Sequence, residues 1–445
     1  MLKVLLALLL QPKIMSRDPE RVKSIIESLR QEFEKTPQYN TVKDDFDTKP
    51  EIMEQKILSV IIPARNEFPN VVHTFYSIMH CWEADGFDSK DIEIIIVDNA
   101  SNDWHDEKFD FTKPGDRGTT KYMMPRGGYY SQTLRVLYDP IAGNHSARNK
   151  GARIARGKYL FFSDAHMAYK PGFFKYGLKT VDESGGIVHG GIGWMGAYPP
   201  HAGGVGMQYT IKLGEEWKGT WNNYRPQTKD WFYIPAQGHC SVLVNRKQFL
   251  DFGGYPDVHR TYGGGEFYTN MKWWMFGSTV AADPRCIGYH LASSRGYSYH
   301  HDDYIHNVFN CGWALGCDDW VERTHLNYLR QGRKEVLDKM MEEARVEIKE
   351  NREWIASRRV KTFNELLVER PWDKFNVERN GASNSSMLIF HPTWLTLLKD
   401  APEYVREAYR NSPLQKELDV FIREKLWDKV YKKDDPNYQL KHSDV

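Results

Sequence analysis

The sequence predicts an α/β fold in which helices flank a mostly parallel β-sheet, with helical extensions at the N- and C-terminal ends. Three observations support this prediction. The apolar stretches ILSVII, IEIIIV and YLFF are continuous, which indicates strands that are buried on both faces. Helical patterns separate these stretches, as in successive β-α-β units. Each stretch also ends abruptly in polar residues, and ligands of open α/β sheets bind beyond the carboxyl ends of the strands.

The composition is that of a globular protein without a strong overall charge. Of 445 residues, 41% are hydrophobic and 27% are charged, and the formal net charge of +1 gives no reason to expect an overall field that attracts polyanions. Aromatic residues make up 13%, which suits either stacking against sugars or a Trp-rich core. The five cysteines show no paired spacing, so a reducing, cytoplasmic compartment is expected.

Residues 1–50 are expected to form a helical extension. Apolar residues recur at helical spacing in residues 17–36, on a charged background. The run MLKVLLALLL is too short to span a bilayer and no other stretch approaches that length, so no transmembrane segment is expected. A packed or membrane-touching helix is favoured for this run over a weak signal peptide or anchor.

A central domain is expected over residues 51–330. One strand begins at Ile57 and runs into the polar loop PARNE, a helix follows, and a second strand from Ile92 ends in VDNASND. Another helix over residues 145–157 leads to the strand that begins at Tyr159. The domain therefore alternates strands and helices, as α/β domains do.

The composition shifts to charged helical patterns after this domain, which predicts a helical C-terminal region over residues 331–445. Its Lys and Arg residues at 349–361 could meet phosphates, although an exposed face of mixed charge is favoured. Nucleic acid is thus a partner that the sequence allows but does not favour.

The segment YLFFSDAHM places Asp164 and His166 at the tip of a strand. Residues i and i+2 of a strand point to the same side, so the carboxylate and the imidazole can converge on one ion. Such ligands suit Mn²⁺ or a similar cation better than Ca²⁺, and the lack of nearby thiolates disfavours structural zinc. The alternative is an Asp that caps the next turn beside an incidental His.

The polar tips of the predicted parallel strands are expected to meet at one edge of the sheet. Asp98 and Asp164 would lie together at this edge. Asp98 could accept a hydrogen bond from the ribose or base of a nucleotide, while the cation bridges a diphosphate that would otherwise repel the carboxylates.

Four segments, taken in order, resemble the nucleotide-sugar glycosyltransferases of the GT-A fold, which are related to the family 2 glycosyltransferases. They are IIPARNE, VDNASND, ARNKGARIARGKYLFFSDAH and YGGGEFYTNMKWWMFG. Within this group the particular likeness is to the polypeptide N-acetylgalactosaminyltransferases, which carry Asp-x-His, then Trp-Gly-Gly-Glu-Asn, then Gly-His. This chain has DAH at 164–166, YGGGEF at 262–267 and IGYHLASSRGY at 287–297. The resemblance spans roughly residues 57–325.

The resemblance implies an enzyme that moves a sugar from a nucleoside diphosphate, with UDP as the expected nucleotide, to an acceptor hydroxyl. It implies a divalent cation, Mn²⁺ or Mg²⁺, held by Asp164, His166 and His290. Two residues that the resemblance assigns to donor binding also have a structural interpretation. Arg148 could be an exposed helix residue, and Glu67 could be a charge favoured at a helix N-terminus. A larger set of residues would hold the nucleoside, the ribose or the donor sugar: Pro63, Arg65, Asn66, Glu67, Asp98, Arg148 and Asn149.

The segment SSRGYSYHHDDYIHN, at 293–307, combines charged and aromatic residues with a glycine. We expect a lid over the diphosphate, in which Arg295 makes a bidentate phosphate contact and Tyr297 stacks. A second metal site built from its histidines is the alternative, and a solvated loop is favoured over that site.

Three glycines precede Glu266, which suggests backbone that approaches another group closely or takes positive φ. By the resemblance, the loop with Gly264 and Gly265 lies between donor and acceptor, and Glu266 orients the sugar or the incoming hydroxyl. Inverting relatives often have Glu-Asp here and retaining relatives Glu-Asn, whereas this chain has Phe267. Either Glu266 is the base, or the leaving diphosphate takes the proton on the same face; retention of configuration is favoured.

Unlike these relatives, the chain is expected to have no lectin module, no Golgi anchor and no paired cysteines. The acceptor is therefore expected to be cytoplasmic: a glycan or lipid-linked precursor, a protein, or a hydroxylated DNA base. Two rivals remain open. Phe267 favours a non-catalytic nucleotide-sugar-binding protein, and a nucleotidyltransferase would use similar carboxylates but would need a Gly-rich loop that PARNE lacks.

Overall fold

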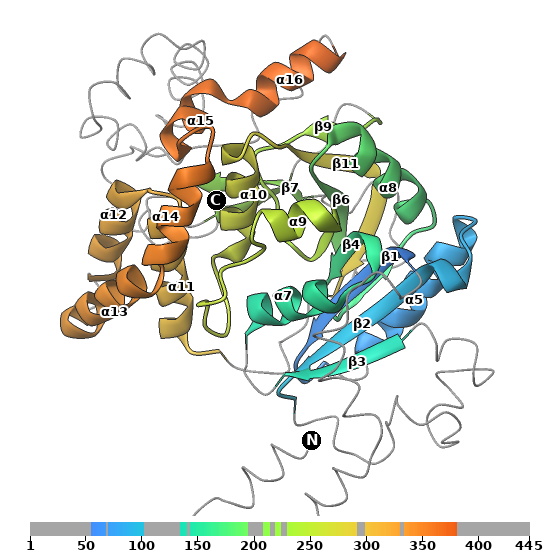
Figure 1. Ribbon diagram of the computed structural model, residues 1–445, viewed down its shortest axis with the longest axis horizontal. Coiled ribbons are helices and arrows are strands. Elements are labelled where there is room, and N and C mark those ends of the chain that lie inside the picture. The colour runs from blue at the N-terminus through green and yellow to red at the C-terminus, as the bar shows by residue number, and fades with distance from the viewer. Residues whose placement is uncertain are drawn as a thin grey trace, which may run out of the picture.

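The structure is a computed structural model of the chain, and it confirms the α/β architecture (Figure 1). The predicted helix over residues 17–36 lies outside the described part of the chain. So do the C-terminal helical segments predicted after residue 380. The described residues are 55–67, 70–101, 134–139, 143–194, 208–213, 219–223, 229–291, 299–329 and 333–380.

The main sheet has nine strands in the order β3-β2-β1-β4-β10-β6-β11-β5, with β9 paired to β11. The first four strands in this order run parallel to one another, as predicted. They are β3 (Leu134–Asp139), β2 (Ile92–Asn99), β1 (Lys56–Ala64) and β4 (Gly157–Ser163). The remaining strands are β10 (Ser241–Asn245), β6 (Ile187–Trp194), β11 (Val280–His290), β5 (Met167–Tyr169) and β9 (Phe232–Tyr233).

The second half of the sheet is mixed, where the sequence predicted a mostly parallel sheet. β10 runs antiparallel to both β4 and β6, β11 is parallel to β6, and β5 and β9 are antiparallel to β11. β6 and β11 are interrupted by Gly and polar residues, and β5, β9 and β10 have at most five residues each, so none gives a long continuous apolar signal. A separate two-stranded hairpin consists of β7 (Gln208–Leu213) and β8 (Gly219–Asn223).

Helices cover both faces of the sheet, because strand side chains alternate between two cores (Figure 1). Ile62 of β1 faces one core, and its neighbour Ile61 faces the other. The first core is closed by α5 (Asn70–Ala84) and α8 (Phe173–Ser184). The second is closed by α7 (Asn144–Ile154), α9 (Arg246–Asp251) and α10 (Gly265–Met275).

The helices after residue 300 pack as one group beside α10 (Figure 1). The buried side chains of Leu337, Ile355 and Trp372 belong to the same core as Trp274 of α10. The domain boundary predicted at residue 330 therefore separates segments that share one core. The boundary itself stays a prediction. These helices are α11 (His301–Ala314), α12 (Asp318–Leu329), α13 (Lys334–Glu347), α14 (Lys349–Arg358), α15 (Phe363–Glu369) and α16 (Pro371–Asn380).

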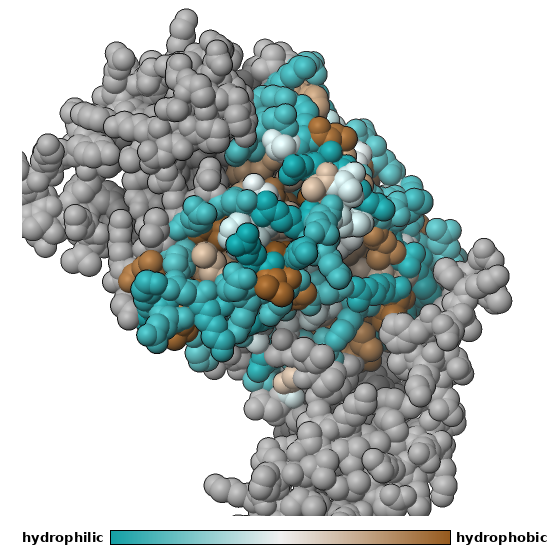
Figure 2. Space-filling view, turned by 60° about the vertical axis from the view of Figure 1, so that its left-hand side comes forward, coloured by the Kyte–Doolittle hydropathy of each residue, from teal (hydrophilic) through white to brown (hydrophobic). Residues whose placement is uncertain are grey.

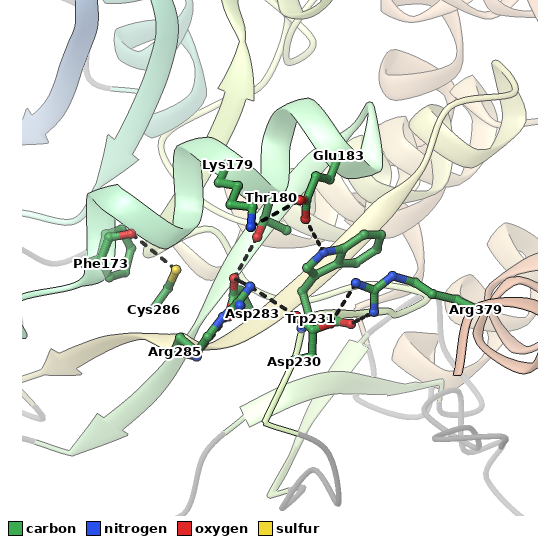
Figure 3. Close-up of polar contacts among 10 residues, drawn as sticks. All are labelled: Phe173, Lys179, Thr180, Glu183, Asp230, Trp231, Asp283, Arg285, Cys286 and Arg379. Carbon is green, nitrogen blue, oxygen red and sulfur yellow. Dashed lines mark hydrogen bonds and ion pairs between the residues drawn. The ribbon is translucent and has the colours of Figure 1, made fainter. Parts of the chain in front are cut away.

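The last of these helices, α16, is held against the sheet edge by polar contacts (Figure 3). The guanidinium of Arg379 lies 3.6 Å from the ring centroid of Trp231 and donates to Asp230 at 2.8 Å. The amide of Asn376 donates to the C=O of Tyr233 and accepts from its N–H, at 2.9 and 2.8 Å. α16 thereby completes the hydrogen bonds of β9 at the sheet edge.

The described surface is mainly hydrophilic on the face seen in Figure 2, with separate small apolar areas. None of the helices in the described part of the chain has the length and apolar character that a bilayer crossing requires.

Candidate functional site

Asp164, His166 and His290 come together beyond the carboxyl end of β4. Asp164 directly follows β4, His166 precedes β5, and His290 ends β11. The antiparallel pairing of β5 with β11 places Met167 opposite His290, and the N–H of Leu291 donates to the C=O of His166 at 3.1 Å. A short backbone ladder thus joins two segments that are far apart in the sequence. The three residues are called the ligand group below.

The ligand group has a spacing that fits a single cation. One ligand atom from each residue lies within 4.8 Å of the others. Nε2 of His166 is 3.1 Å from Nε2 of His290, which is 3.6 Å from Oδ2 of Asp164. Ligands that bind one ion at about 2.1 Å are roughly 3.0–3.4 Å apart at octahedral or tetrahedral angles. The donor set of two imidazoles and a carboxylate suits a borderline divalent cation.

Among the described residues, this is the one cluster of three or more His, Cys, Asp or Glu that could hold a metal. The alternative second site, built from the histidines of 293–307, is not found there. His306 is instead buried in α11, with its Nε2 3.0 Å from Oε2 of Glu347.

Arg148 supports Asp164 from the side opposite to His290. Its Nη2 donates to Oδ1 of Asp164 at 2.7 Å and to the C=O of His239 at 3.1 Å. The Arg148 side chain is 1% exposed, which excludes the alternative of an exposed helix residue. Burial by itself would raise the pKa of Asp164, but the hydrogen bond with His290 and the charge of Arg148 hold this pKa well below its ordinary value.

The loop after β1 lies beside the ligand group. Oε1 of Glu67 is 3.1 Å from Nδ1 of His166, and Glu67 is buried. The N–H of Asn66, a residue with φ of 53°, donates to Oγ of Ser101 at 2.9 Å. The N–H of Ser101 in turn donates to the buried Asp98 carboxylate at 3.1 Å. The predicted tips of β1 and β2 are thus joined at the same sheet edge.

Roles in donor binding stay predictions for the residues of this edge. Pro63 and Arg65 are half-buried. Asn149 is buried in α7, where its side chain binds both the N–H and the C=O of Tyr255 at 3.0 and 2.8 Å. It also donates to Asp257 at 2.7 Å. These contacts give Asn149 a structural role in anchoring the 255–257 segment.

The glycines before Glu266 take the backbone conformations that the sequence suggested. Gly263 and Gly264 have φ of 110° and 79°. A Cβ on Gly265 would lie 2.2 Å from Nε2 of His145, so the close approach is also confirmed. Glu266 is half-buried in the first turn of α10, and its charge acts on Arg148. Phe267 is buried and packs against Phe363, with ring centroids 6.1 Å apart.

A buried polar layer beneath Asp164 was missed by the sequence reasoning. Asn270 of α10 bonds to His189 at 2.7 Å and to His239 at 3.0 Å, and His239 bonds to the hydroxyl of Tyr255. Burial, together with the charges of His189 and Arg148, lowers the pKa of His239 well below its ordinary value. The one available signal was the polar QGH in the middle of an apolar stretch, IPAQGHCSVLV.

Several predicted residues lie outside the described part of the chain. Arg295 and Tyr297 fall in residues 292–298, so the predicted lid is untested. Trp231, one of the tryptophans for which the composition left stacking against sugars or core packing open, is buried and packs under Arg379.

Residues 59–241 match the family model described as Glycosyl transferase family 2. This stretch is therefore similar to the family 2 glycosyltransferases, and the resemblance to glycosyltransferases predicted from the motifs is confirmed. Polypeptide N-acetylgalactosaminyltransferase 3 of Drosophila melanogaster is 24% identical over 227 residues, which are 46% of this chain and 31% of that protein. The chain thus spans under a third of the length of this curated relative.

Two solved structures are also similar. The crystal structure of GalNAc-T7 with UDP, GalNAc and Mn²⁺ has a TM-score of 0.46 and 18% identity, and the match covers 65% of this chain and 55% of that one. The crystal structure of S. aureus TarS 1-349 in complex with UDP-GlcNAc has a TM-score of 0.41 and 14% identity, with coverage of 73% and 92%.

Proposed function

We propose that this chain transfers a hexosyl or N-acetylhexosaminyl group from a UDP-sugar to an acceptor hydroxyl. The observation that carries the proposal is the convergence of Asp164, His166 and His290 at the carboxyl edge of the sheet. The match to the glycosyl transferase family 2 model and the N-acetylgalactosaminyltransferase relative support the reaction class.

In this proposal the ligand group holds a divalent cation, Mn²⁺ or Mg²⁺. The bound cation supplies charge stabilisation for the departing diphosphate. The nucleoside lies along the loops after β1 and β2, beside Arg65, Asn66 and Asp98. Asp98 accepts a hydrogen bond from the ribose or the base, and the residues of the predicted lid, Arg295 and Tyr297, cover the phosphates.

We propose that transfer proceeds with retention of configuration. The bond from the anomeric carbon to the diphosphate oxygen breaks, and the acceptor oxygen bonds to that carbon on the same face. The departing diphosphate takes the proton of the acceptor hydroxyl. Phe267 supports this route because a buried aromatic ring occupies the place where inverting relatives carry the base. Glu266 orients the sugar or the hydroxyl, and NMR of the product anomer tests the stereochemistry.

A sugar-release assay without acceptor tests the proposed activity. The chain is incubated with UDP-GlcNAc or UDP-GalNAc, labelled in the sugar, and with Mn²⁺. We expect slow release of labelled sugar that EDTA abolishes. Asp164→Asn should lower this rate by about 10²–10³-fold, because the charge that holds the cation is lost. The control is Arg153→Gln on the exposed side of α7, which should release sugar at the wild-type rate.

Phe267 also favours a second candidate, a nucleotide-sugar-binding protein without catalysis. The same assay separates the two functions when donor binding is measured beside it by thermal shift. Transfer to acceptor pools is followed by mass spectrometry. If the donor stabilises the chain but no sugar is released and none is transferred, the transferase is contradicted and the binding protein is supported.

A further inference from the structure

We propose that Glu67 is a positioning residue that orients His166 toward the cation. The sequence predicted Glu67 as a nucleoside contact. The inference rests on the proposed cation site, and it assigns a role to a residue outside the ligand group. Three observations support it: the distance from Glu67 to His166, the burial of Glu67, and the way in which α5 holds the backbone on both sides of His166.

The two nitrogens of His166 face different partners. Nδ1 lies 3.1 Å from Oε1 of Glu67, while Nε2 lies 3.1 Å from Nε2 of His290. Oε1 of Glu67 lies at ion-pair distance from Nδ1 without an aligned hydrogen bond, and the nearby carboxylate favours the tautomer with the proton on Nδ1 because it attracts an N–H and repels a lone pair. That tautomer leaves the lone pair of Nε2 available on the side of His290 and Asp164. A carboxylate behind a ligating histidine is a recurrent device for fixing ring orientation in metal sites.

Glu67 is itself held in place by the protein. Its side chain is 8% exposed, so water competes little for the carboxylate. Its second oxygen, Oε2, accepts from Nδ2 of Asn70 at 3.4 Å, at the first residue of α5. Both carboxylate oxygens thus face protein groups, which suits an orienting role better than a contact with the donor nucleoside.

The backbone around His166 is fixed by the same helix. The hydroxyl of Thr74 in α5 lies 2.9 and 3.0 Å from the C=O groups of Ala165 and Met167, and it accepts the N–H of Met167 at 2.8 Å. Thr74 is fully buried. The backbone is therefore fixed on both sides of His166. We infer that Glu67 acts on the remaining variable, which is the orientation of the imidazole ring.

The experiment measures Mn²⁺ binding by the electron paramagnetic resonance signal of free Mn²⁺, without any donor. We expect Glu67→Ala to weaken Mn²⁺ binding by about 10- to 100-fold, as for other partners that orient metal ligands. Glu67→Gln keeps an oxygen that can accept from Nδ1, so it should recover most of the affinity. In the metal-free protein, ¹⁵N NMR should show that Glu67→Ala lowers the fraction of His166 protonated at Nδ1 and that Glu67→Gln restores it.

Two controls separate this role from others. Asp338→Ala removes a carboxylate that lies 2.7 Å from Nε2 of His325, in the helices after residue 300, and it should leave Mn²⁺ binding unchanged. UDP binding in EDTA tests the nucleoside contact that the sequence predicted, and Glu67→Ala should leave it within twofold of wild type.

The inference is overturned if Glu67→Ala binds Mn²⁺ as wild type does, or if Glu67→Gln is as weak as Glu67→Ala. It is also overturned if Glu67→Ala weakens UDP binding in EDTA while Mn²⁺ binding is retained. The proposed function fails separately. A chain whose Mn²⁺ binding depends on Asp164 and on Glu67, but which never releases or transfers sugar, would contradict the transferase and leave the positioning role of Glu67 intact.

Discussion

At the scale of single residues, two members of the ligand group, Asp164 and His166, each have a second contact that favours the atom that faces the others. Arg148 donates a hydrogen bond to Oδ1 of Asp164, and Oδ2 of the same carboxylate faces His290. Glu67 lies at Nδ1 of His166, so Nε2 faces His290. Such contacts reduce the conformational freedom that a bound ion would otherwise have to remove. Two of the three ligand atoms, on Asp164 and His166, are therefore positioned before any ion binds.

The contact between Gly265 and His145 gives a prediction at the residue scale. The methyl group added by Gly265→Ala would lie 2.2 Å from Nε2 of His145. His145 cannot retreat, because it is fully buried, stacks on Tyr255 with centroids 4.9 Å apart, and bonds to His259 at 2.9 Å. We expect Gly265→Ala to destabilise the fold by about 1–3 kcal/mol. It should also slow sugar release, because Glu266 follows directly in the chain.

A double-mutant cycle isolates this contact. His145→Ala removes the ring that clashes. The double variant His145→Ala/Gly265→Ala should therefore lose less unfolding free energy than the two single variants together, by at least about 1 kcal/mol. Urea unfolding measures the four free energies. Losses that add to within about 0.5 kcal/mol would show that His145 does not limit the space at Gly265.

At the scale of elements, the sequence predicted the parts whose signal is local. The continuous apolar strands β1, β2 and β4 and the helices α5 and α7 were found where expected, as were Asp164 and His166 at a strand tip. The antiparallel β10 was not foreseen, because its place between β4 and β6 depends on pairing across long stretches of chain. The position of His290 came from family resemblance, since nothing local to β11 indicates its pairing with β5. The layer with His239 and Asn270 has no motif that marks it.

Helix α10 carries a buried lysine that should make stability depend on pH. Lys272 is fully buried and donates to the C=O of Gly254 and to the hydroxyl of Tyr268. Burial lowers the pKa of Lys272 to about 7, against an ordinary value of 10.5. Between these two values the unfolded chain binds more protons than the folded chain, so the free energy of unfolding rises with pH in this window.

The variant Lys272→Met lacks this titration. Between pH 7 and pH 9 wild type should gain about 2 kcal/mol of stability relative to Lys272→Met, from about 1.4 kcal/mol per pH unit. Urea unfolding at both pH values measures the change. Lys247→Met, at an exposed lysine, serves as the control and should follow wild type. Parallel pH profiles for wild type and Lys272→Met would show that Lys272 does not change its charge in this range.

At the scale of the whole molecule, the helices after residue 330 share their core with the sheet domain. Leu337, Ile355 and Trp372 are at most 1% exposed, in the same core as α10 and α11. Burying each such side chain stabilises the fold by about 1.5–3 kcal/mol. Three of them therefore contribute an amount comparable with the total stability of a typical domain, about 5–15 kcal/mol. α16 adds polar contacts to the β9 segment through Asn376. Its Arg379 also donates to Asp230 (Figure 3).

This sharing of one core predicts how shortened chains behave. A chain that ends at residue 330 loses α13 to α16, which exposes Trp274 and leaves the N–H and C=O of Tyr233 without the amide of Asn376. We expect it to aggregate or to unfold without cooperativity, whereas a chain that ends at residue 380 should unfold in one transition. Thermal unfolding and limited proteolysis of the two chains measure the difference. If the chain that ends at residue 330 unfolds cooperatively within a few degrees of the longer one, residues 331–380 form a separate unit and the division predicted from the sequence is correct.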